Sequence, residues 1–311
     1  RERQPFCHKA TPVPQIALGY TSKAYQKSSP VPYSRSLGML QGSLDIVLDG
    51  QNSVEILMEH NLSGRMDKYP LIIIPECDYL DPAFKDELTG YVGNGGNLLI
   101  IGAETAQMFG SELGIKSAVK SSGEELFISA DNKIGSVRSE ILKVELNEGS
   151  VPLTRFYKGS DFNYPDQTIA SSMNNYRKGK IAAVYFNAGT SYNEFKTFVI
   201  RDFVNEIVNQ LMPEKVAEVT GSHLVHVAVN NLNGKLYINL INAAGNHQSQ
   251  NTIGYDEVPP LKDIQISLRS EIRPESIILQ PEGKKLRFKY LKGRSIVQIP
   301  ELRQHSILEI N

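Results

Sequence analysis

The first two-thirds of the chain alternates short apolar runs with patterns of helical period. Residues 15–20 (QIALGY) and 71–75 (LIIIP) are nearly continuous apolar runs, which is typical of strands covered on both faces. Residues 53–58 (SVEILM) form a third strand candidate. Residues 37–50 instead place apolar side chains at helical spacing and end at Gly50. This alternation predicts a mostly parallel sheet with helices on its faces.

The clearest strand–helix–strand unit begins at the run LIIIP. Asp81 and Pro82 mark the helix start, because aspartate accepts hydrogen bonds from the first free N–H groups and proline suits the first helical position. Gly95 and Gly96 supply a left-handed helix end, and the apolar run 97–102 (NLLIIG) follows as the next strand. A unit of this length joins parallel neighbours by a right-handed crossover. We therefore predict a flavodoxin-like three-layer α/β domain.

Two later segments extend this domain. Residues 180–189 predict another strand, and residues 195–213 predict one amphipathic helix that Pro213 ends. The expected apolar face of this helix consists of Phe195, Val199, Phe203, Ile207 and Leu211, widened by Phe198 and Val204. Residues 115–179 contain only short strand-like segments, and their arrangement in a sheet cannot be predicted from the sequence.

The pattern changes to period two after Pro213. A series of short segments between residues 223 and 311 mostly alternates apolar and polar side chains, separated by turn signals such as Asn233-Gly234 and Lys292-Gly293. Such spacing predicts an antiparallel β-sandwich. We therefore expect an α/β domain over residues 1–213 and a β-sandwich domain over residues 214–311.

Composition and charge limit the classes of partner. The chain has 311 residues, 41% of them apolar, and a net charge of −1. This charge gives no electrostatic case for nucleic acid or an anionic membrane, and no apolar run approaches the roughly 20 residues that cross a bilayer. Cys7 and Cys77 are too few for a disulfide framework, and whether they pair stays open. The chain begins with Arg1 rather than Met, as expected of a processed protein or a piece of a longer one.

Three segments resemble known proteins. Two of them are similar to the trimerisation domain of bacterial β-galactosidases that carry a catalytic barrel, namely residues 68–102 (KYPLIIIPECDYLDPAFKDELTGYVGNGGNLLIIG) and 174–186 (NNYRKGKIAAVYF). Arg177 replaces a glycine of the usual phrase. Residues 225–245 (VHVAVNNLNGKLYINLINAAG) are similar to the C-terminal β domain of related glycoside hydrolase-like proteins. The resemblance implies a glutamine amidotransferase-like fold for the α/β domain.

The resemblance also implies a role. The catalytic carboxylates of those enzymes lie on an upstream barrel, and no segment here provides one. We therefore expect a noncatalytic C-terminal module of a bacterial glycoside hydrolase-like protein. The module would serve assembly, as an oligomer or against the upstream barrel, or it would help to frame a carbohydrate site. The resemblance implies a secreted or periplasmic location, and we expect no cofactor.

The turn after NLLIIG is where an amidotransferase active site would place its cysteine. Gly102 or Ala103 stands at that position, so the turn lacks the nucleophile that this chemistry needs. Cys77 follows the preceding strand, but its neighbours Glu76 and Asp78 disfavour a thiolate. We predict no catalytic residue in this chain and interpret Cys77 as a structural side chain.

Three carboxylates are expected at the carboxyl edge of the sheet, where ligands bind in such folds. Glu76 and Asp78 follow one strand, and Glu104 follows the next. Together they would suit a sugar hydroxyl or a metal ion. Alternatively, they are helix-terminus residues that the helix dipole favours. The scattered histidines offer no metal pair, and we predict no metal site.

The long loop of residues 21–36 opens onto the same edge of the predicted sheet. Its candidate contact residues are Tyr25, Tyr33 and Arg35, whose side chains suit stacking on a sugar ring or docking on another domain. The alternative is an ordinary surface loop that happens to contain tyrosines.

Two other functions stay open at this point. A carbohydrate-active hydrolase would use the acidic residues at the sheet edge, provided that they converge across a cleft. A sugar-binding module would use the β domain. The chain has no tryptophan, however, and the aromatic residues of this region are Tyr237, Tyr255, Phe288 and Tyr290. This composition disfavours the sugar-binding module.

Overall fold

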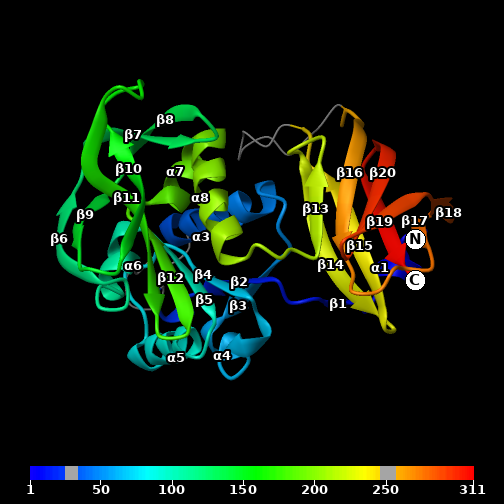
Figure 1. Cartoon of the computed structure of the whole chain (residues 1–311), viewed down its shortest axis with the longest axis horizontal. Coiled ribbons are helices and arrows are strands. Elements are labelled where there is room, and N and C mark those ends of the chain that lie inside the picture. Colours follow the sequence, from blue (N-terminus) through cyan, green and yellow to red (C-terminus); the bar gives the residue numbers. More distant parts are fainter. Residues whose placement is uncertain (25–33, 246–256) are drawn as a thin grey trace. The chain divides into compact units, whose positions relative to one another are not determined.

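The computed structural model describes residues 1–24, 34–245 and 257–311 (Figure 1). The fold is mixed α/β, and its described strands form four sheets. The helices in these residues are all too short or too polar to span a bilayer.

The chain forms two compact units. Ile16–Val47 and Glu55–Pro213 make up the first, here called the α/β unit. Arg1–Gln15, Leu48–Val54 and Glu214–Asn311 make up the second, here called the β unit.

Two short segments lie in a different unit from the one that the sequence predicts. The predicted division at Pro213 assigns them to the α/β domain, whereas their contacts are with the C-terminal strands. Thr11–Pro12 pairs with Val225–Leu232, and the Val229 N–H donates to Ser53 Oγ at 3.0 Å. Residues 1–15 carry no periodic pattern, and residues 48–54 join the end of one pattern to the start of the next, so hydrophobic periodicity gives no sign of partners this distant in sequence.

One nine-stranded sheet dominates the α/β unit, in the order β3-β2-β4-β5-β12-β11-β10-β7-β8. Its strands are β2 (Ile16–Tyr20), β3 (Val54–Met58), β4 (Leu71–Ile74), β5 (Asn97–Ile101), β7 (Glu125–Ala130), β8 (Lys133–Arg138), β10 (Val151–Tyr157), β11 (Pro165–Tyr176) and β12 (Gly179–Val184). A separate two-stranded sheet pairs β6 (Ile115–Ser121) with β9 (Ile141–Leu146). Most of the strands after β5 come from residues 115–179, for which the sequence predicts no definite arrangement of strands.

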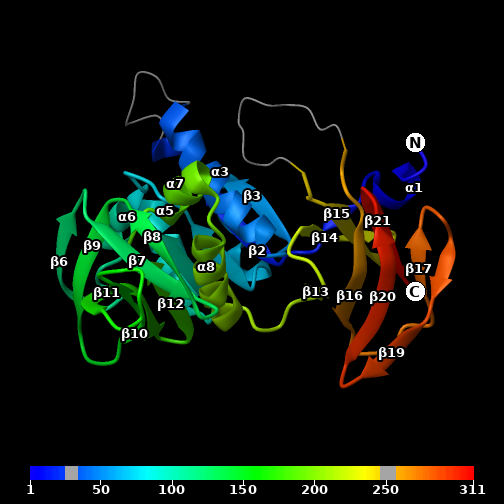
Figure 2. The ribbon, with the colours of Figure 1, turned by 90° about the horizontal axis from the view of Figure 1, so that it is seen from above.

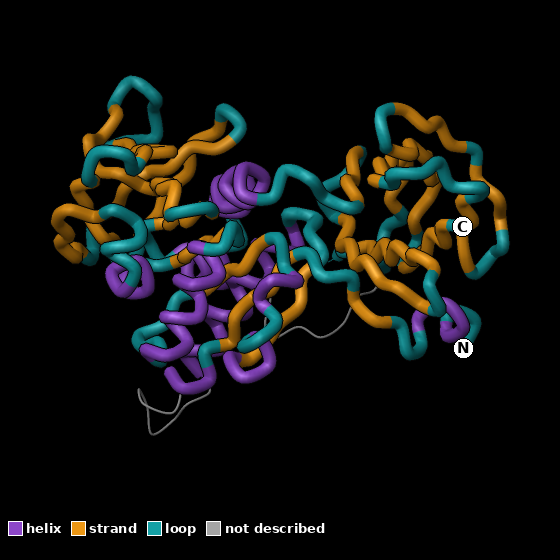
Figure 3. The backbone as a smooth tube through the Cα atoms, turned by 60° about the horizontal axis from the view of Figure 1, so that its bottom comes forward, coloured by secondary structure: helices purple, strands orange, loops and turns teal. Residues whose placement is uncertain are grey.

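Helices accompany the parallel part of this sheet, as Figure 3 shows. They are α3 (Ser34–Asp49), α4 (Glu59–Leu62), α5 (Pro82–Gly93), α6 (Ala103–Met108), α7 (Ala188–Phe195) and α8 (Phe198–Leu211), with the short 3₁₀ helix η1 (Met66–Lys68). The parallel pairs are β2 with β4, β4 with β5, and β5 with β12, whereas β12, β11, β10, β7 and β8 pair antiparallel. The parallel pairing predicted for the two apolar runs around α5 is confirmed.

Helix α5 begins and ends where the sequence predicts. Asp81 Oδ1 accepts from the Ala83 N–H at 3.0 Å, and Gly95 has a φ of 114°. A Cβ on Gly96 would lie 2.2 Å from the Tyr91 ring, so only glycine fits there. The Tyr91 hydroxyl donates to the Tyr69 carbonyl at 2.8 Å and thereby joins α5 to the start of β4.

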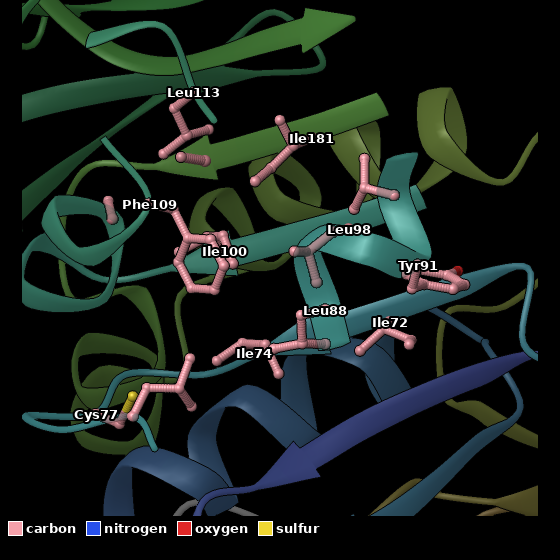
Figure 4. Close-up of a cluster of buried hydrophobic side chains, with 14 of the residues drawn as sticks. Ile72, Ile74, Cys77, Leu88, Tyr91, Leu98, Ile100, Phe109, Leu113 and Ile181 are labelled. Atoms are coloured by element: carbon pink, nitrogen blue, oxygen red, sulfur yellow. The ribbon is translucent and has the colours of Figure 1, made fainter. Parts of the chain in front are cut away.

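Figure 4 shows the core between the sheet and its helices. Side chains of β4, β5 and β12, such as Ile72, Leu98 and Ile181, meet Leu88 of α5 and Phe109 after α6. All five are at most 1% exposed. This packing holds the carboxyl ends of β4 and β5 next to each other.

The single helix predicted over residues 195–213 is wrong. The chain forms α7 and α8, which separate at Lys196, a residue with a φ of 50°. Phe195 and Phe198 flank this break and are 57% and 47% exposed. The apolar spacing continues across the break, which hides it from a periodicity argument. The predicted face from Val199 onward is confirmed as buried.

The β unit contains two antiparallel sheets, in the orders β1-β14-β15-β21-β17-β18 and β13-β16-β20-β19 (Figures 1 and 2). Its elements are α1 (Gln4–Cys7), β1 (Thr11–Pro12), β13 (Ala217–Thr220), β14 (Val225–Leu232), β15 (Lys235–Asn242), β16 (Leu261–Arg269), β17 (Ile277–Gln280), β18 (Lys284–Leu286), β19 (Phe288–Leu291), β20 (Arg294–Leu302) and β21 (His305–Ile310). Apolar side chains of both sheets, among them Leu240 and Ile266, share one core. Residues 285–291 (KLRFKYL), whose alternating pattern predicts one strand, instead contribute to β18 and β19, which belong to different sheets.

Candidate site at the carboxyl edge of the parallel strands

A cavity of about 400 Å³ lies at the carboxyl ends of β4 and β5, within the α/β unit. Glu76, Asp78 and Glu104 all line it, so the structure brings the three predicted carboxylates around one space. We call it the carboxyl-edge pocket. Its other polar lining residues include Ser122, Arg138, Ser139, Glu140, Asn187, Thr190, Ser191 and Glu194.

Glu76 is the most deeply buried of these carboxyls, with 4% of the residue exposed. The Thr190 N–H donates to its two oxygens at 3.0 and 3.3 Å, and the Thr190 hydroxyl donates to Oε2. Because Thr190 lies in the first turn of α7, Glu76 caps the N-terminus of that helix.

Burial raises the pKa of Glu76 to about 7. The hydrogen bonds from Thr190 and Gly189 oppose the rise, and the negative charge of Asp78 adds to it. No cation forms an ion pair with Glu76 among the described residues. The carboxyl group therefore changes its charge near neutral pH.

Gly102 occupies the turn between β5 and α6. Its φ of 107° is a conformation that residues with side chains rarely adopt, and a Cβ there would lie 2.6 Å from Cγ of Glu76. The N–H of the following Ala103 donates to Asn187 Oδ1 at 3.1 Å. Glu76 thus fills the space above a turn at which neither Gly102 nor Ala103 offers a nucleophile.

Cys77 is a buried thiol beside this turn, with 3% of the residue exposed. Burial raises the pKa of Cys77 to about 11, so the thiol is protonated at neutral pH. Its backbone N–H donates to Thr105 Oγ1 at 2.9 Å, which ties the end of β4 to α6. Cys7 and Cys77 are both free cysteines. These contacts favour the structural interpretation of Cys77.

The remaining acids of the carboxyl-edge pocket are more accessible. Asp78 is exposed, and Glu104 forms an ion pair with Lys120 of β6. Glu140 and Glu194 were not among the predicted site residues. Glu140 comes from residues 115–179, for which the sequence predicts no definite strand arrangement, and Glu194 lies on α7, a helix that the sequence does not predict. Across the described residues, no group of three His, Cys, Asp or Glu side chains is arranged to hold a metal ion.

The loop candidates fall largely beyond the described part of the chain. Tyr25 and Tyr33 lie outside the described residues. Arg35 belongs to α3, and its side chain also lies outside what the structure describes. A role of these three residues stays a prediction.

Comparison with known proteins gives a likeness in structure only. No family model matches the sequence, and no curated protein matches it. The alpha-L-fucosidase isoenzyme 2 from Paenibacillus thiaminolyticus has a TM-score of 0.78 at 15% identity, over 100% of this chain and 50% of that one. A beta-galactosidase from Bacillus circulans sp. alkalophilus has a TM-score of 0.65 at 14% identity, over 100% and 43%. A GH42 beta-galactosidase from G. stearothermophilus has a TM-score of 0.64 at 12% identity, over 99% and 42%.

These identities are low, so the likeness concerns the fold alone. The chain spans half or less of the length of these three structures. Its fold is therefore similar to that of a part of several glycoside hydrolases.

Proposed function

We propose that this chain is a noncatalytic module of a bacterial glycoside hydrolase-like protein. The proposal rests on the likeness in fold, which extends over the whole chain and over half or less of each glycoside hydrolase. The turn at Gly102 and Ala103, which offers no nucleophile, supports a noncatalytic role. In this proposal the α/β unit is flavodoxin-like, of the amidotransferase type that the trimerisation domain of β-galactosidases has. The β unit is a sandwich domain.

The carboxyl-edge pocket is proposed to help frame a carbohydrate site. Its lining combines carboxylates with the amide of Asn187 and the hydroxyls of Ser139 and Ser191. Such groups both donate to and accept from sugar hydroxyls, and they orient a small ligand in a concave site. Glu76 would form the pocket floor, because its oxygens are already engaged by α7.

A titration of neutral oligosaccharides tests this role. Calorimetry on the whole chain should detect galactosides or fucosides, and E104Q/E194Q should weaken binding by about tenfold, as two lost polar contacts would. E125Q/E145Q, a pair on β7 and β9 that does not line the pocket, is the matched control. Equal affinity of both double variants, or no binding at all, would overturn the framing role.

Assembly is the second part of the proposal. The module would associate with its own copies or with an upstream barrel. Light scattering after size exclusion should show an oligomer of the isolated chain if self-association is the mechanism. A monomer that gains a stable complex only with an upstream catalytic segment would assign the contact to the barrel. A monomer that also fails to bind such a segment would reject an assembly role.

One observation favours a second candidate, a carbohydrate hydrolase. Glu76 has a pKa of about 7 beside Asp78 and Glu104, and a general acid in a glycosidase needs a raised pKa next to a second carboxylate. Hydrolysis through Glu76 would fall as pH rises through about 7, where the carboxyl loses its proton. A pH–rate profile without this decline would reject the candidate.

A further inference from the structure

The segment 284–294 (KKLRFKYLKGR) concentrates positive charge in the β unit. It contains Lys284, Lys285, Arg287, Lys289, Lys292 and Arg294 and no acidic residue, whereas the whole chain has a net charge of −1. Such local asymmetry in a nearly neutral protein creates a positive potential over a small area.

This segment passes from one sheet of the β unit to the other. β18 is the edge strand of the six-stranded sheet and β19 is the edge strand of the four-stranded sheet, and Arg287 lies between them. Leu286 is buried and Phe288 packs against the core, while Lys285, Arg287 and Lys289 are exposed. We call these three cations the basic row. In extended chain, alternate side chains recur about every 7 Å on one side.

The basic row has no acidic partner within the described part of the chain. Among the ion pairs of the described residues, none involves Lys285, Arg287 or Lys289. Arg294, by contrast, pairs with Glu218 at 3.1 Å. The Arg273 guanidinium lies 5.6 Å from the centre of the Phe288 ring and adds a fourth cation near the row.

The aromatic residues of this segment are not arranged to stack on a neutral sugar. Phe288 packs against the core. The Tyr290 hydroxyl donates to the carbonyls of Ser270 and Glu271 at 3.1 and 3.0 Å, which holds the side chain against its own unit. This edge therefore offers charged side chains, rather than free aromatic rings, to a ligand.

We propose that the basic row binds an anionic polysaccharide, one that carries uronate or sulfate groups. Charge complementarity supports a polyanion, because exposed cations at alternate positions of one segment, without an ion-pair partner among the described residues, suit a chain of repeated anions. That the polyanion is a carbohydrate rests on the proposed function. The binding site lies in the β unit and is separate from the carboxyl-edge pocket of the α/β unit.

The test uses the whole chain and a variant of the row, K285Q/R287Q/K289Q. Polygalacturonate and dextran sulfate are the probes, neutral dextran is the uncharged control, and duplex DNA is the competing polyanion. K9Q/K178Q/K262Q removes the same charge from exposed lysines elsewhere. Thermal unfolding of each variant checks that the fold is retained.

The wild type should bind an acidic polysaccharide, with affinity that falls as salt rises, and should not bind dextran. The row variant should bind about 100-fold more weakly at low salt and show a shallower salt dependence, whereas the control should bind nearly as the wild type. Equal binding by the two variants, or no binding by the wild type, would overturn the proposal. DNA bound as tightly as polygalacturonate would overturn the assignment to carbohydrate.

A neutral oligosaccharide titrated in the same series separates this proposal from the proposed function. Binding at the carboxyl-edge pocket should be unchanged in K285Q/R287Q/K289Q. Loss of the acidic polysaccharide alone therefore reports on the basic row. If the row binds no acidic polysaccharide while neutral sugars still bind, its lysines protect the two edge strands from pairing with other chains, and the proposal fails.

Discussion

Glu76 in the α/β unit and Glu309 in the β unit are both little exposed, at 4% and 7% of the residues, but Glu76 lies much deeper in its unit. Their pKa values nevertheless shift in opposite directions. Burial raises the pKa of Glu76 to about 7. Burial also acts to raise the pKa of Glu309, but hydrogen bonds from Lys235 and Gln280 and the charge of Lys235 outweigh it, so its pKa is lowered.

The difference lies in the depth of burial and in the partners. Lys235 Nζ and Gln280 Nε2 each lie 2.8 Å from an oxygen of Glu309, so β15, β17 and β21 are joined through a charged group. Among the described residues, Glu76 receives its hydrogen bonds from neutral groups of α7, and it borders a cavity. Burial alone therefore does not mark a functional carboxyl. A buried carboxyl that titrates near pH 7 in a polar cavity is the better candidate for a site.

The largest expected effect comes from G102A. The added Cβ would lie 2.6 Å from Cγ of Glu76 in a backbone conformation that disfavours side chains. We expect the free energy of unfolding of the α/β unit to fall by about 3 kcal/mol. Urea unfolding measures this loss. G90A is the control, because a Cβ there meets nothing within 4 Å, and it should leave stability equal or slightly higher.

The next effect is the pH dependence that Glu76 causes. The folded pKa of about 7 lies above the usual value of 4.5, so this group stabilises the fold fully below pH 4.5 and loses that contribution as pH rises through about 7. The loss amounts to about 3 kcal/mol for a single buried group. E76Q should remove this slope from unfolding curves recorded between pH 4.5 and 8. An unchanged slope would mean that Glu76 is not the group that titrates.

Glu309 should behave in the opposite sense. Its lowered pKa gives stability that is present above about pH 4.5 and is lost as pH falls through the folded pKa. K235Q should therefore lower the free energy of unfolding of the β unit at pH 7, modestly because water partly screens the half-exposed lysine, and should change it little at acidic pH. Chemical unfolding at pH 7 and pH 3 would show this. An equal loss of stability in K235Q at both pH values would mean that the charge of Glu309 does not depend on Lys235. K262Q controls for the loss of an exposed charge.

The sequence predicts best where chemistry is local. The helix start at Asp81, its glycine stop and the two apolar strands beside it are recognisable because each signal lies within a few residues of its effect. The grouping of Glu76, Asp78 and Glu104 at one edge follows from the rule that parallel strands end together.

The features that the sequence does not predict depend on contacts between segments that are distant in sequence. Glu140 reaches the carboxyl-edge pocket from the connection between β8 and β9, and Glu194 reaches it from α7. No periodic pattern in the sequence predicts either position. The break at Lys196 is hidden because apolar spacing continues across it. The raised pKa of Glu76 depends on its burial against α7, more than one hundred positions away in sequence. These features emerge only when tertiary packing fixes the partners.

The carboxyl-edge pocket is proposed to frame a ligand without reacting with it. The most direct measurement is turnover of a panel of aryl glycosides by the purified chain, wild type and E76Q, between pH 5 and pH 8. We predict no release of the aryl alcohol above the uncatalysed rate for either protein. Turnover by the wild type that disappears in E76Q would contradict the account and would make Glu76 a catalytic acid.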